Sequence, residues 1–177
     1  MKIENWDKLL NKYEYASREK IYERIENKGF MSLPEDQDII NSVVLWKLNR
    51  QVSINDEDIE NLNSIAKTIN KQEKLKENEK EFIEFMNTLL ERKGLKAAMA
   101  STILHFYQPN VFPIIDKRAY RQVFGENLRN NCNANDYLQY CYKCYEISEK
   151  NGIEIKEIDK VLYQLDKERG FKLDDKV

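Results

Sequence analysis

The sequence predicts an all-α protein, folded as a compact multi-helix globule. Glycine and proline, which break helices, are scarce, with five and three among 177 residues. Charged residues make up 34% of the chain and hydrophobic residues 41%. Apolar residues recur every three or four positions in nearly every segment, and no strand pattern is evident. A chain of this length buries roughly 70% of its surface, so we expect one domain over residues 1–177.

The first half of the chain predicts four helices. Three are expected within residues 6–13, 17–29 and 35–50, and Pro34 suits the start of the third. Asn55 or Asp56 begins the fourth helix, whose apolar side chains fall on one face at residues 59, 62, 65 and 69. Residues 71–80 form a run of charges that we expect to be a solvated first turn or loop.

The second half predicts five more helices. An amphipathic helix over residues 82–90 is followed by Gly94, which suits a left-handed turn. The next helix runs to residue 107, where two prolines interrupt it. Asp116 is a good N-cap for a helix over residues 117–124, and Gly125 ends that helix. Helices over residues 136–150 and 155–168 complete the chain.

Several classes of protein are excluded. The longest uncharged run, residues 97–115, contains Pro109, Pro113 and polar residues, so it does not predict a membrane span. The chain opens on an amphipathic helix, which indicates no signal peptide. Three clustered cysteines, Cys132, Cys141 and Cys144, do not suit a disulfide framework and are typical of a reducing cytoplasm. We expect them to be small buried residues and predict no metal site.

The charge is unevenly distributed. Residues 92–121 contain six basic residues and one acid, a net charge of +5, while the rest of the chain carries −7. A local basic segment on an acidic body suits the binding of phosphates by one face. A chance cluster of solvated lysine and arginine side chains explains the same pattern.

Residues 82–121 contain the most informative arrangement. One helix ends near Gly94, and after a tight turn the next begins with small residues from Ala97 onward. The backbone amides at a helix start favour a phosphate. Beyond the proline-containing loop, Asp116 precedes Lys117, Arg118 and Arg121. The segment therefore predicts a helix–hairpin–helix followed by a helix that begins at a carboxylate among cations.

This segment, residues 82–125, resembles the helix-hairpin-helix DNA glycosylase superfamily. Members have a G-V-G-x-K-T-A hairpin, then a hydrophobic-Asp-x-His-hydrophobic-x-Arg motif whose Asp lies eighteen residues after the hairpin Lys. Here Gly94 falls on the first hairpin glycine, Ala100 on the alanine, Asp116 on the aspartate and Arg121 on the arginine. Lys96 replaces the second glycine, Arg118 the histidine, and Ala98 the lysine with which some members form a Schiff base.

The resemblance implies a monofunctional DNA N-glycosylase of base excision repair, a hydrolase that uses Asp116 and no cofactor. An iron–sulfur cluster, found in some relatives, would need four cysteines. Duplex DNA is the expected partner, and the expected DNA-binding residues are Gly94, Leu95, Lys96, Lys117, Arg118 and Arg121. Asp116 also has a purely structural explanation, because aspartate is among the best N-caps.

Other pocket candidates are residues whose side chains stack on or bind a base, namely Trp46, Lys47, Arg50, His105 and Tyr107. A tryptophan or a lone histidine is more often a packing residue. Two alternatives stay open for the whole chain. It is a DNA- or nucleotide-binding relative without catalysis, or a helical protein-interaction domain. Salt-dependent duplex binding separates these classes, as does base release.

Overall fold

The computed structural model describes residues 54–170 without a gap, together with residues 23, 38, 41–46, 48, 52 and 172. It divides the chain into two units, residues 1–52 and 53–177. In the first unit, residues 41–46 are helical. In the second, the described residues form seven helices and no strand, which confirms the all-α prediction. A single domain over the whole chain stays a prediction.

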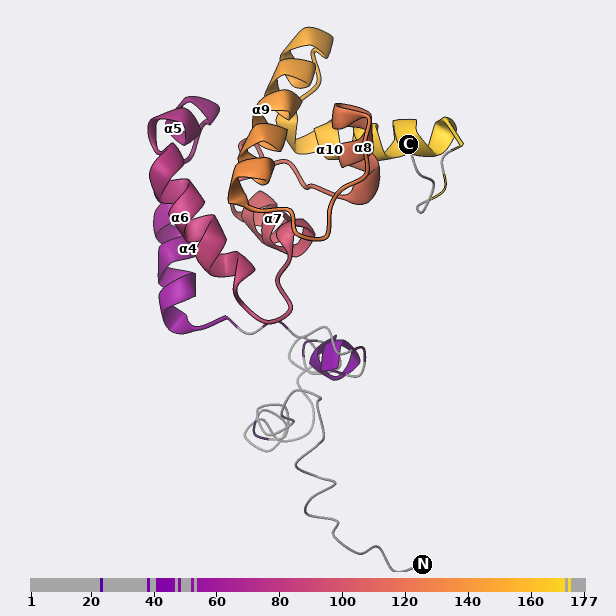
Figure 1. Cartoon of the computed structure of the whole chain (residues 1–177). Helices are drawn as coiled ribbons and strands as arrows, with labels where there is room; N and C mark the ends of the chain where they lie inside the picture. Colours follow the sequence, from indigo (N-terminus) through magenta and orange to yellow (C-terminus); the bar gives the residue numbers. More distant parts are fainter. Residues whose placement is uncertain are drawn as a thin grey trace, which may run out of the picture. The chain divides into compact units, whose positions relative to one another are not determined.

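The helices of the second unit match the predicted segments closely (Figure 1). They are α4 (Asp56–Thr68), α5 (Gln72–Glu77), α6 (Glu79–Leu90), α7 (Ala97–Tyr107), α8 (Lys117–Phe124), α9 (Ala134–Asn151) and α10 (Ile155–Glu168). Asn55 is the N-cap of α4, and Asn133 is the N-cap of α9. Each accepts a hydrogen bond from the amide three residues on, and each forms a capping box with an aspartate.

The charge run over residues 71–80 is the one segment here whose prediction is wrong. It is helical, forming α5 and the start of α6, with Asn78 between them. Leu75 is fully buried within it. Burial of this one leucine supplies the apolar contact that a charged six-residue helix needs, since so short a helix is not stable alone.

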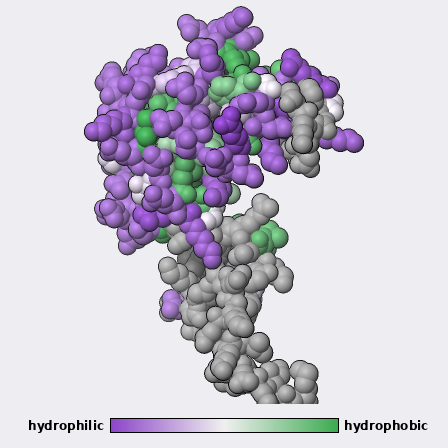
Figure 2. Space-filling view, in the orientation of Figure 1, coloured by the Kyte–Doolittle hydropathy of each residue, from purple (hydrophilic) through white to green (hydrophobic). Residues whose placement is uncertain are grey.

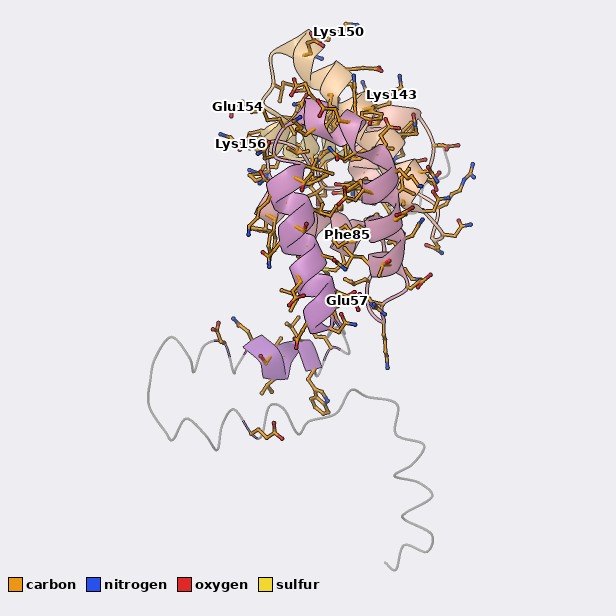
Figure 3. All side chains as sticks on the ribbon, turned by 90° about the vertical axis from the view of Figure 1, so that its left-hand side faces the viewer. Glu57, Phe85, Lys143, Lys150, Glu154 and Lys156 are labelled. Carbon is orange, nitrogen blue, oxygen red and sulfur yellow. The ribbon has the colours of Figure 1, made fainter. Side chains whose placement is uncertain are left out.

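α6 lies at the centre of the packing and contacts α4, α5, α7 and α9, while α8 and α10 pack against each other and against α9. Phe85 is buried between α4 and α6, and the charged residues labelled in Figure 3 lie at the periphery. In the core, Phe82 of α6 stacks on Phe112 of the α7–α8 loop at 5.3 Å between ring centroids. This contact anchors the loop that precedes α8.

The face seen in Figure 2 is mainly hydrophilic, with narrow hydrophobic patches. None of the described helices is long and apolar enough to cross a membrane.

Candidate functional site

A pocket of about 430 Å³ lies where α7 and α8 begin. We call it the Asp116 pocket. It joins four segments of the chain: the start of α7, the start of α8, the α8–α9 loop, and one residue of α10. Its lining residues are Lys96, Ala97, Ala98, Asp116, Lys117, Arg118, Leu128, Arg129, Asn130, Cys132 and Tyr163. The hairpin and the aspartate helix, predicted from separate stretches of sequence, therefore meet at one cavity.

Asp116 is the N-cap of α8, as predicted. Its Oδ1 accepts hydrogen bonds from the amides of Arg118 at 2.7 Å and Ala119 at 2.8 Å. No described residue donates a hydrogen bond to Oδ2. Partial burial raises the pKa of Asp116 above its ordinary value, and the two amide bonds oppose this rise. One oxygen of the carboxylate thus holds the helix, and the other is left for chemistry at the pocket.

The loop before Asp116 is held by its backbone carbonyls. Three tyrosine hydroxyls of α9 donate to three of them, at 2.6 Å from Tyr145 to Val111, 3.0 Å from Tyr137 to Pro113 and 2.9 Å from Tyr140 to Ile114. The fourth carbonyl, that of Phe112, lies 2.8 Å from His105 Nδ1. A carbonyl only accepts, so Nδ1 donates. Four successive carbonyls are therefore satisfied, which fixes the path of the chain into Asp116.

Ser101 connects this loop to α7. Its hydroxyl is fully buried, donates to the Ala98 carbonyl at 2.9 Å and accepts from the Ile115 amide at 3.1 Å. Ile115 immediately precedes Asp116, and Ala98 lines the pocket. One side chain thus sets the spacing between the hairpin helix and the carboxylate.

We expect Ser101→Ala to destabilise the protein by about 1–3 kcal/mol, because the buried Ile115 amide loses its acceptor. Thr102→Ala is the matched control, since the half-buried Thr102 hydroxyl donates to the same Ala98 carbonyl at 2.8 Å. That change should cost no more than about 0.5 kcal/mol. Urea denaturation of both variants measures the difference, and equal losses would contradict a connecting role for Ser101.

Arg118 forms one wall of the pocket and is held in place from α10. Its Nη1 donates to Asp166 Oδ2 at 2.7 Å. Its guanidinium carbon lies 5.6 Å from the centroid of the Tyr163 ring, within the range of a cation–π contact. Asp166 is fully buried, and hydrogen bonds, chiefly from Arg121, lower its pKa to about 2. The carboxylate therefore stays ionised and keeps the Arg118 side chain at the pocket.

Arg121 does not fit the predicted role in DNA binding. It is only 3% exposed, and its Nε and Nη2 donate to the two Asp166 oxygens at 2.9 and 2.7 Å. Such a bidentate pair leaves no accessible surface for a phosphate, and it shows that Arg121 joins α8 to α10. Leu95 does not present its side chain at the surface either. Its side chain is buried, and its amide donates to the Arg92 carbonyl at 3.1 Å.

The other predicted DNA-binding residues lie at the surface around the pocket. Gly94 adopts φ +86° in the hairpin turn, a conformation that favours glycine. Lys96 is the N-cap residue of α7, and both Lys96 and Lys117 are exposed. Arg92, counted in the basic segment, forms two 2.9 Å hydrogen bonds with Asp58 instead. At least three of the six bases in residues 92–121, namely Arg92, Arg118 and Arg121, are therefore in ion pairs with described residues.

The structure assigns none of the remaining pocket candidates to the lining of the Asp116 pocket. His105 and Tyr107 are not among its lining residues, and His105 instead supports the loop before Asp116. Trp46 is half-buried within the first unit. Lys47 and Arg50 lie outside the described residues.

All three cysteines are buried, as predicted, and none forms a disulfide. Burial raises the pKa of the Cys132 thiol to about 11, so this pocket residue is no nucleophile at neutral pH. Across the part of the chain that is described, no group of three or more histidine, cysteine or acidic side chains could hold a metal ion.

Sequence reasoning missed several lining residues, among them Tyr163, Leu128 and Arg129, and it missed Asp166 behind them. The sequence did contain one indication that Asp166 is buried, namely the spacing of apolar residues on α10. Buried positions on α10 recur at Ile155, Ile158 and Leu162, and Asp166 continues that row. A buried acid that stays ionised needs a cationic partner. No such signal existed for the pocket residues, because they depend on how the α8–α9 loop folds.

Comparison of the chain with known proteins gives no match to a family model, to a curated protein or to a solved structure.

Proposed function

We propose that the protein binds duplex DNA and hydrolyses the N-glycosidic bond of an extruded base, acting in the cytoplasm as a monofunctional DNA glycosylase. The observation that carries this proposal is the Asp116 pocket. One cavity brings together the start of the hairpin helix, several cations, and a carboxylate whose Oδ2 accepts no hydrogen bond from a described residue. Its volume of about 430 Å³ lies within the range of small-ligand sites, roughly 300–1,000 Å³.

In the proposed reaction the sugar of the extruded nucleotide lies beside Asp116 Oδ2. The bond between C1′ and the base nitrogen breaks, and the base leaves with the electron pair and takes a proton from solvent. The carboxylate stabilises the positive charge that develops on the sugar. A water oxygen then bonds to C1′ and loses its proton to the carboxylate, which is the role of a general base. The products are the free base and an abasic site.

The residues present favour hydrolysis over a lyase reaction. Ala98 lines the pocket at the position where the resemblance would require a Schiff-base lysine. Lys96 lies two residues earlier, and side chains two apart do not share a helix face. The cations of Lys96, Lys117 and Arg129 would contact phosphates, which fixes the position of the DNA without reading its sequence.

A non-catalytic DNA-binding relative is the second candidate, and one observation favours it. Arg118 stands where the family has a histidine, and its Nη1 is hydrogen-bonded to Asp166 at 2.7 Å. A site that keeps its cations and loses a polar catalytic group would still bind DNA.

The first experiment measures base release from duplexes that carry uracil, oxidised bases or alkylated bases, scored as new abasic sites. Release from any of them supports the glycosylase. Absence of release, with salt-sensitive duplex binding retained, supports the non-catalytic relative.

Duplex binding is tested separately through its salt dependence. We expect Lys96→Gln to reduce the slope of log affinity against log salt by about 1, because one phosphate contact is lost. Lys150→Gln is the matched control, since Lys150 is exposed at the end of α9 and lies outside the pocket lining (Figure 3). An equal slope in both variants, or no duplex binding by the wild type, would contradict the proposal.

A further inference from the structure

Asp159 on α10 is a buried carboxylate that the proposed reaction does not use. The residue is only 8% exposed, and no described residue donates a hydrogen bond to its buried Oδ1. Asp166, seven residues further along the same helix, accepts two hydrogen bonds from Arg121 instead. A buried charge without a donor or a counter-charge costs free energy. An ionised Asp159 therefore requires a cation nearby.

The charges around Asp159 act on its proton affinity in both directions. Burial is the main influence and raises the pKa of Asp159 above 3.8. The charge of His105 on α7 comes next and lowers this pKa, as Lys160 does more weakly, whereas the charge of Asp116 raises it. Lys160 is exposed and already pairs with Glu157 at 2.8 Å. His105 is thus the stronger of the two cations.

The neighbours of Asp159 on α9 supply no positive charge. The Tyr140 hydroxyl already donates to the Ile114 carbonyl at 2.9 Å. Burial is the main reason why the pKa values of Tyr140 and Cys144 are raised, and the charge of Asp159 adds to it. Both side chains therefore stay neutral around neutral pH.

His105 uses one of its two ring nitrogens for the loop before Asp116. Its Nδ1 donates to the Phe112 carbonyl at 2.8 Å, and no described residue forms a hydrogen bond with Nε2. A charged histidine ring has a proton on both nitrogens. Because the Phe112 carbonyl keeps the proton on Nδ1, it is Nε2 that gains and releases the second proton.

We propose that His105 is the counter-ion of Asp159, and that the two are positioning residues for the loop that leads into Asp116. When the ring carries both protons, its charge compensates the buried carboxylate. The hydrogen bond from Nδ1 to the Phe112 carbonyl is then charge-assisted and stronger. When Nε2 releases its proton, the carboxylate is left uncompensated and this bond weakens. The pair concerns the protein by itself and does not rest on the proposed function.

The test is a double-mutant cycle of His105→Asn and Asp159→Asn, measured as melting temperatures at pH 6 and pH 9. The asparagine amide can replace Nδ1 as a donor to Phe112, so that substitution removes mainly Nε2 and its charge. At pH 6 the loss in the double variant should be smaller than the sum of the two single losses by about 3 °C. At pH 9 a histidine ring is neutral, so the losses should add to within about 1 °C.

Glu157→Gln, combined with His105→Asn, is the matched control. The pKa of Glu157 is lowered chiefly by its hydrogen bond with Lys160 and only slightly by the charge of His105. Its side chain is 45% exposed, and solvent screens such a charge. This cycle should be additive at both pH values. Additive losses for Asp159 at pH 6, or equal coupling for Glu157, overturn the inference.

A second measurement needs no variant, because His105 is the only histidine in the chain. Its ring nitrogens can be followed by ¹⁵N NMR. Besides the titration of the ring, they should show a second transition in acid, above pH 3.8, where Asp159 takes up its proton. This transition should persist in Glu157→Gln and vanish in Asp159→Asn. A wild-type ring with a single transition, or an acid transition that Asp159→Asn retains, overturns the pairing.

Discussion

Replacing Asp116 with asparagine is expected to reduce base release at least about 100-fold while leaving the protein folded. The loss follows because a neutral amide cannot stabilise the positive charge on the departing sugar, and removal of one such electrostatic contact typically costs 100- to 1,000-fold in rate. The fold survives because asparagine caps helices about as well as aspartate. Its side-chain oxygen can still accept the Arg118 and Ala119 amides. Single-turnover release from the best duplex measures the effect.

The same variant should be at least as stable as the wild type at neutral pH. The folded-state pKa of Asp116 is raised above its ordinary value of 3.8, so the ionised carboxylate costs stability at higher pH. This cost disappears as the pH falls through the folded pKa toward 3.8. Melting temperatures should therefore favour asparagine at pH 7 and converge with the wild type in acid. For the same reason, the acid limb of wild-type activity should lie above 3.8.

Asp56→Asn provides the matched control for this pair of measurements. Asp56 is an exposed aspartate in the first turn of α4 and lies outside the Asp116 pocket. The substitution removes one negative charge at a helix start, as Asp116→Asn does, and should leave base release unchanged. Full activity in Asp116→Asn would show that Asp116 only caps α8, and equal losses in both variants would point to net charge as the cause.

The second large effect is expected at Asp166. Asp166→Asn should destabilise the protein by about 3–5 kcal/mol, because it removes the buried carboxylate that pairs with the buried Arg121 guanidinium. Arg121 is 2% exposed in its side chain and Asp166 is fully buried. For a chain of this size the loss corresponds to a fall in melting temperature of roughly 10 °C. Thermal unfolding followed by circular dichroism measures it.

The pH dependence of this effect has the opposite sign to that of Asp116. Hydrogen bonds from Arg121 lower the pKa of Asp166 to about 2, so its contribution is complete above its unfolded value, near 4. That contribution is lost as the pH falls from about 4 through 2. The difference between wild type and Asp166→Asn should therefore be constant from pH 5 to 8. A difference that shrinks at pH 5 would contradict the ionised pair.

Glu157→Gln is the control for Asp166. Glu157 lies on the same helix and pairs with Lys160 at 2.8 Å, but the two side chains are 45% and 64% exposed. Solvent screens such surface pairs, so we expect no measurable change in melting temperature. A loss as large as that of Asp166→Asn would show that α10 tolerates no change of charge.

Local signals predicted the helices and the position of Asp116. The Asp116 cap and the Gly125 stop bound α8 at the predicted residues, because capping depends only on neighbours in sequence. The capping boxes of α4 and α9 are local in the same sense. The error at residues 71–80 arose because Leu75 is buried in the hydrophobic core, which a single leucine within a run of charges does not reveal.

The directions of side chains were harder to predict. Arg118 and Arg121 lie three residues apart on α8, and the sequence offers both as phosphate ligands. Only the fold shows that Asp166, 45 residues after Arg121, occupies both guanidinium groups.

The hydrogen bonds to the four carbonyls of residues 111–114 lower the entropic cost of binding a ligand. A segment whose hydrogen bonds are already complete loses little conformational entropy when a ligand arrives. In the proposed complex Asp116 therefore occupies the same position before and after binding. The free-energy cost of deformation is then mainly that of bending and unpairing the nucleic acid. Duplexes that are mismatched or already bent should associate most readily, since part of that distortion is present before they meet the protein.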